Sequence, residues 1–317
     1  MNIALDVTPL RLTNAGTARY LRNLIARLDV KQIAFGGGDR TSVLARELWW
    51  YPMRLSALGD VDVLHCPTYY GPVRPRVPTV VTVHDLAVLR HPDAFPRWTR
   101  SYAPRLIPRV LRAASRVIAV SEFTAAEVEA LVGVSRDRIR VVANAVDPVF
   151  TPEGPQADGD YVLAVGTLEP RKNITRAVEA ARRSRLPLRV VGARGWGGVE
   201  PDGASWLGEV DDEELARQYR GAHCVVYPSL YEGFGIPVLE AMACGAPVVT
   251  SAGGATEEVA DGAAVLVNPL DIAGIASGIE EAIERRDDLR ERGLARARAF
   301  SWDAAAEQTL AVYGEVA

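Results

Sequence analysis

The stretch SLYEGFGIPVLEAMACGAPVV, Ser229–Val249, contains the signals for a loop, a helix and the start of a strand. Pro237 is favoured in the first turn of a helix, because the N–H that proline lacks is not needed there. Gly245 and Pro247 end that helix before the apolar run VVTS. The segment 233–235 therefore forms a loop that leads into a helix N-terminus, where free backbone N–H groups and the helix dipole favour an anion.

The same alternation of strand and helix extends along the chain. Short runs rich in Val and Ile alternate with stretches of helical period, which predicts parallel sheets with crossover helices, a doubly wound α/β fold. We expect strands at residues 2–6, 63–65, 79–84, 116–119, 139–142, 161–165, 188–191, 224–227, 247–250 and 264–266. We expect helices at residues 18–28, 104–114, 124–131, 174–183, 213–220, 237–243, 272–285 and 303–314.

A linker composition separates two series of these elements. The segment DPVFTPEGPQADGD, residues 147–160, holds three prolines, two glycines and several acids. We therefore expect two Rossmann-like domains, residues 1–150 and 151–300, followed by a last segment, 301–317. Two such domains place a ligand cleft at the carboxyl ends of their sheets.

Composition limits the class of protein. With 317 residues, 48% of them hydrophobic and 24% charged, the chain is typical of a soluble globular protein. Its three cysteines are far apart, which favours neither a zinc site nor a disulfide framework and fits a reducing cytoplasm. No signal peptide and no 18-residue apolar run is present, so we expect a cytoplasmic location.

Charge is distributed unevenly. Residues 1–150 hold 20 Lys and Arg against 13 Asp and Glu, a net of +7, whereas residues 151–317 hold 16 against 27, a net of −11. The basic half could meet an anionic ligand or surface, or the two domains could face each other with opposite charge.

Two glutamates of the opening stretch are candidate ligand contacts. We place Glu240 in the first turn of the helix, where a carboxylate is favoured and could accept bonds from two neighbouring hydroxyls, as a ribose offers. Glu232 follows the strand at 224–227 and could reach the same cleft from the other side. The alternative is a capping Glu240 and a solvent-facing Glu232.

Two further motifs follow predicted strands. In VGTLEPRKN, residues 165–173, Arg171 and Lys172 suit a diphosphate, since each charge-assisted hydrogen bond contributes about 1.5 to 3 kcal/mol; the alternative is a solvated turn. In VTVHDL, His84 is a candidate to hold a hydroxyl or a proton, or is simply a satisfied, partly buried side chain. Gly16 in TNAGTARY would let a ligand come close, although a lone glycine is a weak signal.

Other patterns suggest surfaces rather than catalysis. Asp60 and Asp62 have the D-x-D spacing of a metal site but stand in an acidic turn before a strand. A basic helix face that could contact anionic lipid at the inner membrane surface is predicted on Arg105, Arg109, Arg112 and Arg116. The alternative is a solvated face interrupted by prolines.

Taken together, these motifs resemble a known family. The stretch YEGFGIPVLEAMACGAPVV resembles the E-x7-E signature of glycosyltransferase family 4. The segments VGTLEPRKN, VTVHDL, SRVIAVSEFTAAEV, GATEEVADGAAVLVNP and FSWDAAAEQTLAVY resemble further parts of that family in the same order. The resemblance implies a GT-B fold, with the donor in the C-terminal domain, the acceptor in the N-terminal domain, and the last helix crossing back to the first domain. It also implies retention of anomeric configuration and no requirement for a metal or cofactor.

The resemblance also implies roles for individual residues. Glu240 would bind the ribose hydroxyls, Glu232 the donor sugar, and Arg171 with Lys172 the leaving diphosphate. The remaining implied contacts are the amides of Phe234, Gly235 and Ile236 with sugar and phosphate, His84 with the transferred sugar, Gly16 with the phosphates, Glu209 and Val210 with the base, and Glu258 beside the donor pocket. Departures from the family are Thr167, where many relatives have arginine, and Ala143-Asn144-Ala145 in place of Pro-Asn-Gly.

The function expected is a retaining glycosyltransferase that moves a hexosyl unit, with mannosyl from a GDP-mannose type donor favoured, to a saccharide or lipid-linked acceptor. Since no side chain is an obvious nucleophile, a front-face mechanism is favoured. The alternatives are a nucleotide-sugar epimerase or hydrolase of the same fold and a nucleotide-sugar-binding protein without turnover.

Overall fold

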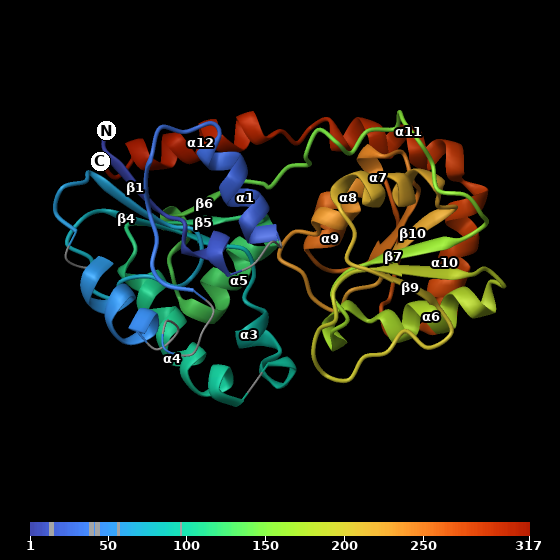
Figure 1. The fold of residues 1–317 in the computed structure, drawn as a ribbon, viewed down its shortest axis with the longest axis horizontal. Coiled ribbons are helices and arrows are strands. Elements are labelled where there is room, and N and C mark those ends of the chain that lie inside the picture. Colours follow the sequence, from blue (N-terminus) through green and yellow to red (C-terminus); the bar gives the residue numbers. More distant parts are fainter. Residues whose placement is uncertain (13–15, 38–40, 42–44, 56–57, 96) are drawn as a thin grey trace. The chain divides into compact units, whose positions relative to one another are not determined.

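The computed structural model describes residues 1–12, 16–37, 41, 45–55, 58–95 and 97–317. The chain divides into two compact units (Figure 1). Unit 1 consists of Met1–Asn144 and Trp302–Ala317, and unit 2 of Ala145–Ser301. Each unit contains one six-stranded sheet in which every pair of neighbouring strands is parallel, so the predicted α/β class is confirmed.

Unit 1 is built on the strand order β2-β1-β3-β4-β5-β6. Its central strands are buried along their length, as expected where helices cover both faces of a parallel sheet. The strands are β1 Ile3–Asp6, β2 Lys31–Ile33, β3 Val63–Cys66, β4 Thr79–Val83, β5 Arg116–Ala119 and β6 Ile139–Val141. The α-helices are α1 Gly16–Ile25, α3 Ala87–Arg90, α4 Arg97–Ala113, α5 Glu122–Val132 and α12 Trp302–Gly314, with a π-helix, η2, at Arg46–Arg54.

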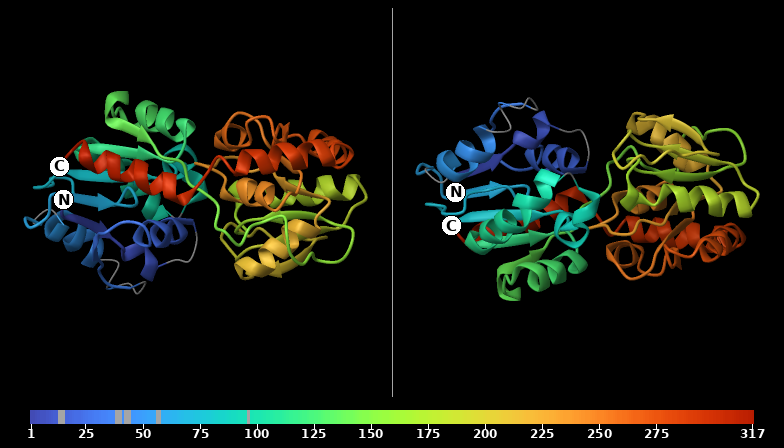
Figure 2. Two further views of the ribbon diagram at one scale, coloured as in Figure 1. Left: turned by 90° about the horizontal axis from the view of Figure 1, so that it is seen from above. Right: turned by 90° about the horizontal axis from the view of Figure 1, so that it is seen from below.

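The C-terminal helix α12 is part of unit 1, in contact with α1 (Figure 2). A buried polar network ties it to the sheet. His65 on β3 pairs its Nδ1 with the Tyr313 hydroxyl at 2.6 Å and its Nε2 with Thr82 Oγ1 at 2.8 Å. The Tyr20 hydroxyl lies 3.0 Å from the same Thr82 oxygen. Burial, with a smaller effect of a neighbouring histidine, lowers the pKa of His65 to about 3, so the ring is neutral.

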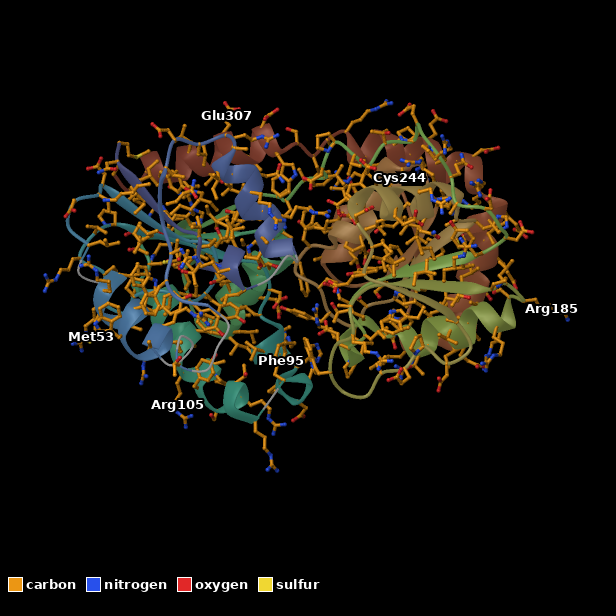
Figure 3. The ribbon with its side chains drawn as sticks, in the orientation of Figure 1. Met53, Phe95, Arg105, Arg185, Cys244 and Glu307 are labelled. Atoms are coloured by element: carbon orange, nitrogen blue, oxygen red, sulfur yellow. The ribbon has the colours of Figure 1, made fainter. Side chains whose placement is uncertain are left out.

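Helix α4 differs from its prediction in two respects. It begins at Arg97 rather than at residue 104 and includes Pro104 and Pro108 in its interior. Arg116 lies on β5 instead of the helix, and its Nε donates to Glu315 at 2.8 Å. The prediction that Arg116 belongs to the basic face of this helix is therefore wrong. Arg105, Arg109 and Arg112 remain exposed on α4, and Arg105 extends away from the helix (Figure 3).

Unit 2 is built on the strand order β12-β11-β10-β7-β8-β9. The strands are β7 Val162–Val165, β8 Leu188–Val191, β9 Ser205–Gly208, β10 Cys224–Tyr227, β11 Val248–Ser251 and β12 Val265–Val267. The helices are η6 Pro170–Lys172, α6 Ile174–Arg183, α7 Asp212–Gly221, α8 Ile236–Ala243, α9 Ala255–Ala260, α10 Ile272–Glu284 and α11 Arg286–Ala297. Across the described residues, no helix has both the length and the apolar character needed to cross a bilayer.

The segment expected as a linker is packed into unit 2. Arg220 donates to the carbonyl oxygens of Thr151 at 3.1 Å and Pro155 at 2.7 Å. The Phe150 ring meets the buried Tyr219 ring edge-on, with centroids 6.0 Å apart. These contacts explain why the division between the units falls after Asn144 rather than after Phe150.

The strand order of unit 2 reverses beside β7. From β7 the chain runs to β8 and β9 on one side, then returns to β10 on the other side and continues to β11 and β12. Ligands of doubly wound sheets bind at the carboxyl ends of the strands where the order reverses. In unit 2 this point is formed by the loop after β7, which carries Arg171 and Lys172, and the loop after β10, which carries Glu232.

Candidate functional site

Asn173 fixes the loop that carries the two cations. Its backbone is left-handed, with φ of 60°, a conformation that asparagine tolerates better than most residues. Its amide Nδ2 donates to the carbonyl oxygens of Pro228 at 2.9 Å and Pro269 at 2.7 Å. The loop after β7 is thereby tied to the loops that follow β10 and β12.

Lys172 is held between a tyrosine and a glutamate. Its Nζ donates to the Tyr227 hydroxyl and to Glu232 Oε1, each at 2.7 Å. Its stem lies over Gly166, where an added Cβ would stand 3.2 Å from Lys172 Cδ. Contacts along the stem and at Nζ together therefore fix the position of the ammonium group.

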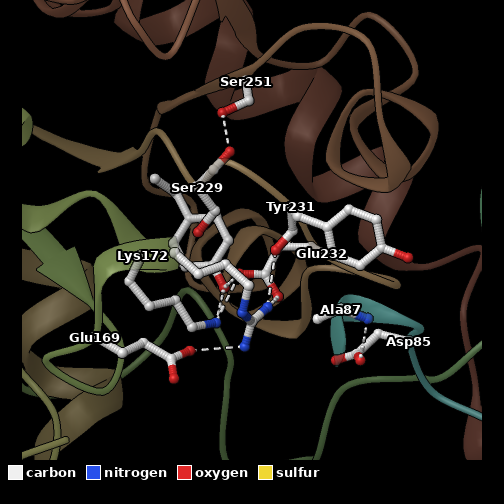
Figure 4. Close-up of polar contacts among 10 residues, drawn as sticks. Asp85, Ala87, Glu169, Lys172, Ser229, Tyr231, Glu232 and Ser251 are labelled. Atoms are coloured by element: carbon white, nitrogen blue, oxygen red, sulfur yellow. Dashed lines mark hydrogen bonds and ion pairs between the residues drawn. The ribbon is translucent and has the colours of Figure 1, made fainter. Parts of the chain in front are cut away.

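Arg171 donates to the other carboxylate oxygen of the same glutamate. The bond from Lys172 to Glu232 is drawn in Figure 4. Arg171 Nη1 donates to Glu232 Oε2 at 3.0 Å and to the carbonyl oxygen of Tyr231 at 2.8 Å, and its Nη2 donates to Glu169 Oε1 at 2.7 Å. The side chains of Arg171, Lys172 and Glu232 are 15%, 13% and 10% exposed, so the group still reaches solvent. The alternatives of a solvated turn and a solvent-facing Glu232 are therefore wrong.

Their mutual attraction keeps Glu232 and Lys172 ionised at neutral pH. Burial acts to raise the pKa of Glu232, but Lys172 and Arg171 outweigh it and hold that pKa at about 2. Burial likewise acts to lower the pKa of Lys172, and Glu232 reverses this so that the pKa is raised. For Glu169 burial raises the pKa, and the nearby Arg171 and Lys172 oppose it only in part.

Helix α8 begins four residues after Glu232, and its N-terminus has no side-chain cap. Its N-cap, Gly235, has φ of 101°, which favours glycine, and an added Cβ would stand 2.9 Å from Thr256 Cγ2. Phe234 turns its ring onto Phe300, with centroids 5.8 Å apart. The backbone from Phe234 to Ile236 thus forms an uncapped helix start, which suits an anion.

Glu240 is not in the first helical turn. Helix α8 begins at Ile236, so Glu240 is its fifth residue, beyond the turn where the dipole favours a carboxylate. It is only 3% exposed, and the buried Tyr219 hydroxyl donates to its Oε2 at 3.0 Å. The predicted stabilisation by the helix N-terminus is therefore wrong, as is the alternative of a capping role, while the ribose contact stays a prediction.

The other donor-side candidates also follow carboxyl ends of unit 2 strands. Val210, after β9, is half-buried and Glu209 is exposed. Glu258 is half-buried on α9, which follows β11, and its carbonyl oxygen accepts from Arg296. Because parallel strands share one carboxyl edge, these residues lie on the same edge of the sheet as Lys172 and Glu232.

His84 follows β4 in unit 1 and is neutral. Its Nε2 lies 3.0 Å from the carbonyl oxygen of Pro67, so Nε2 carries the proton and Nδ1 is an acceptor. Burial, opposed by Asp85, lowers its pKa to about 4. The ring is therefore neutral at pH 7, and its contact with a hydroxyl or a proton of the substrate stays a prediction. Gly16 is the first residue of α1, and residues 13–15 before it lie outside the described part of the chain.

Three residues of the site were not predicted from the sequence: Glu169, Asn173 and Tyr227. Glu169 and Asn173 flank the two cations in VGTLEPRKN, and an asparagine directly after a turn is a recognisable signal for left-handed backbone. Tyr227 looks like an ordinary strand residue, and its hydroxyl finds its partners only in the fold, where it accepts from Lys172 and donates to Glu232 Oε1 at 2.8 Å.

Comparison with known proteins identifies the family. The family model described as "Glycosyltransferase Family 4" matches residues 13–150, and that described as "Glycosyl transferases group 1" matches residues 149–300. The chain is 34% identical to the O-antigen chain mannosyltransferase B of Escherichia coli over 282 residues, which is 79% of this chain and 74% of that protein. The chain belongs to glycosyltransferase family 4. This glycosyltransferase is also 35% identical to a D-inositol 3-phosphate glycosyltransferase of Frankia alni, over 75% of this chain and 68% of that one.

Solved structures share the fold of this glycosyltransferase. Sucrose-phosphate synthase from Thermosynechococcus elongatus has a TM-score of 0.78 at 20% identity, covering 99% of this chain and 98% of that one. The Anabaena protein HepE, crystallised with UDP and glucose, has a TM-score of 0.77 at 17% identity, covering 99% of each chain. These likenesses confirm the predicted GT-B class, with two Rossmann-like domains.

Proposed function

We propose that this glycosyltransferase is a retaining, metal-independent enzyme that moves a hexosyl unit from a nucleoside-diphosphate sugar to a saccharide or lipid-linked acceptor. The observation that carries the proposal is the convergence of Arg171 and Lys172 on one carboxylate at the strand reversal of unit 2. Two fixed cations beside an uncapped helix N-terminus can stabilise the charge that develops on a leaving diphosphate. They supply the positive charge that a metal ion would otherwise provide.

A mannosyl donor of the GDP-mannose type is the version of this proposal that the relatives favour. One relative is described as an O-antigen chain mannosyltransferase. Another, from Mycolicibacterium hassiacum, is described as an MMP alpha-(1->4)-mannosyltransferase and is 32% identical over 292 residues, which is 80% of this chain and 71% of that one.

Charge at Glu232 supports a front-face reaction. A carboxylate whose pKa is held at about 2 by two cations is a weak base and a weak nucleophile. In the proposed reaction the acceptor hydroxyl attacks from the face that the diphosphate leaves, and the donor phosphate takes the hydroxyl proton. A covalent sugar trapped on Glu232, detected by mass spectrometry of the intact protein, would contradict this mechanism.

A thermal-shift panel of GDP-, UDP-, ADP- and dTDP-sugars, each with and without EDTA, tests the donor. A ligand present at 100 times its dissociation constant adds about 2.7 kcal/mol of stability. We expect a clear shift with one nucleotide that EDTA does not change. A shift that EDTA abolishes would contradict the metal-independent reaction, and no shift with any sugar would contradict donor binding.

Product analysis separates the alternatives. An epimerase or hydrolase would change the nucleotide sugar without any acceptor, whereas a transferase consumes it only when an acceptor is present. A variant with both Arg171 and Lys172 changed to methionine should lose the thermal shift, since both cations proposed to bind the diphosphate are then removed.

A further inference from the structure

Glu169 has a buried carboxylate that is only half satisfied. Its side chain is 3% exposed, and its Oε1 accepts from Arg171 Nη2 at 2.7 Å. Its Oε2 is buried and has no hydrogen-bond partner within the described part of the chain. A buried charged oxygen without a donor is costly, and protonation of that oxygen removes part of the cost.

The charges around Glu169 are balanced before any ligand binds. Among the described residues, the charged groups that act on it are Arg171, Lys172 and Glu232. Two cations therefore face two carboxylates. Lys172 donates to Glu232, and Arg171 donates to both carboxylates. A diphosphate that enters this group adds negative charge beyond what the two cations, each already paired with a carboxylate, can balance.

Glu169 is the carboxylate better suited to respond. Glu232 places one oxygen on Lys172 and the other on Arg171, so protonation of either oxygen would weaken an ion pair. Glu169 uses Oε1 alone, and a proton on Oε2 leaves the bond from Arg171 intact. Burial already raises the pKa of Glu169, and a diphosphate nearby raises it further.

We infer that Glu169 is a positioning residue that takes up one proton from solvent when a nucleotide diphosphate binds to Arg171 and Lys172. The inference rests on the proposed function, because it concerns the same site. Protonation removes one negative charge from the group and keeps Arg171 oriented through Oε1. Donor binding is thereby linked to pH through a residue that need not touch the donor.

Calorimetric titration with GDP-mannose, and in parallel with UDP-glucose, tests the inference between about pH 5.5 and 8, where the diphosphate of a nucleotide sugar carries no titrating proton. Uptake of one proton makes the dissociation constant rise by about tenfold per pH unit between the pKa of Glu169 in the free protein and that in the occupied protein. The wild-type protein should also show uptake of about one proton when the heats are compared in two buffers of different ionisation enthalpy.

The Glu169→Gln variant resembles the protonated residue, because an amide keeps an oxygen for Arg171 and has no charge. It should bind at least as tightly as the wild type at pH 8 and show no pH dependence. Glu179→Gln, which removes an exposed carboxylate on α6, is the matched control and should keep the wild-type slope. Circular dichroism checks that each variant is folded.

The inference alone would be overturned if the dissociation constant of the wild type did not change with pH. It would also be overturned if Glu169→Gln kept the wild-type pH dependence of the dissociation constant, or bound more weakly than the wild type by the same factor at every pH. The latter is the behaviour of a merely structural residue. Failure of the wild type to bind GDP-mannose, UDP-glucose or any other sugar of the thermal-shift panel at any pH would overturn the proposed function as well, so the two failures are distinguishable.

Discussion

Glu232 stabilises unit 2 only while it is ionised. Its pKa in the folded protein is about 2, below its ordinary value of 4.5, so its contribution is complete above the ordinary value and is lost as pH falls toward 2. The size is on the order of 3 kcal/mol. We expect the free energy of unfolding, measured with urea at pH 6 and pH 3, to fall more for the wild type than for Glu232→Gln. Parallel pH dependences would contradict this.

Glu240 is the second carboxylate with a residue-level prediction. If it accepts from the ribose hydroxyls, Glu240→Ala should raise the dissociation constant of the donor by at least about tenfold, because a hydrogen bond to a charged group contributes about 1.5 to 3 kcal/mol. The matched control is Tyr219→Phe, which removes the hydroxyl on Oε2 but leaves the carboxylate. Unchanged donor affinity in a folded Glu240→Ala variant would refute the ribose contact.

The sequence was sufficient to predict which residues lie at the site, but it was not sufficient to predict the hydrogen bonds between them. Arg171, Lys172 and Glu232 follow predicted strands, so their place at the carboxyl edge of a parallel sheet could be inferred from the pattern alone. That Glu232 bonds both cations depends on β7 and β10 being neighbours, which local patterns do not specify. The helix start of α8 was predicted within one residue, yet that single residue moves Glu240 out of the first turn.

Among the elements, the start of α8 depends on glycine. Gly235→Ala should lower stability by about 1 to 3 kcal/mol and weaken donor binding, since the new methyl meets Thr256 and the left-handed backbone is strained. Gly253→Ala is the control: Gly253 also has a positive φ, of 81°, but an added Cβ there has nothing within 4 Å. Thermal unfolding and donor titration of both variants separate the steric contact from backbone strain, and equal losses would argue against the contact.

Helix α12 should depend on its buried tyrosine. Tyr313→Phe leaves His65 Nδ1 buried without its partner, at a cost of about 1 to 3 kcal/mol in the stability of unit 1. Tyr102→Phe removes a hydroxyl from a part-buried pair with Tyr70 and should cost less. Urea unfolding of the two variants provides the comparison. A Tyr313→Phe variant as stable as Tyr102→Phe would show that the network does not hold the helix.

Element prediction succeeded for the buried apolar strands, and it missed two of the four edge strands. The apolar strands at Arg116–Ala119, Leu188–Val191 and Cys224–Tyr227 have the predicted bounds. The edge strands β2 and β9 were missed, because exposure gives them polar or mixed sequences. Helix α11, with a charged sequence and few buried residues, carries too weak an apolar period to be recognised.

At the scale of the whole molecule, charge remains uneven between the units. Unit 1 holds 20 Lys and Arg against 15 Asp and Glu, a net of +5, because α12 and the residues after it add acids to it. Unit 2 holds 16 against 25, a net of −9. The exposed arginines of α4 are the part of unit 1 for which contact with an anionic membrane is predicted.

Vesicle binding tests that surface. The protein should sediment with vesicles rich in phosphatidylglycerol at low salt and be released at high salt, since exposed charges are screened. Changing Arg105, Arg109 and Arg112 to alanine should abolish sedimentation. Changing Arg182 and Arg183, which are exposed on α6 of unit 2, should have no effect. If sedimentation does not occur, or does not respond to salt, α4 is an ordinary solvated helix.

The discontinuity of unit 1 sets the order in which the chain can fold during its synthesis. All of unit 2 must be translated before Trp302–Gly314 exists, whereas unit 2 is one continuous segment. Until then His65 lacks Tyr313, and a buried imidazole of the sheet has no partner on that side. Domains usually fold from the N-terminus onward as they emerge from the ribosome. In this protein unit 2 can complete its fold before the last helix of unit 1 has been synthesised.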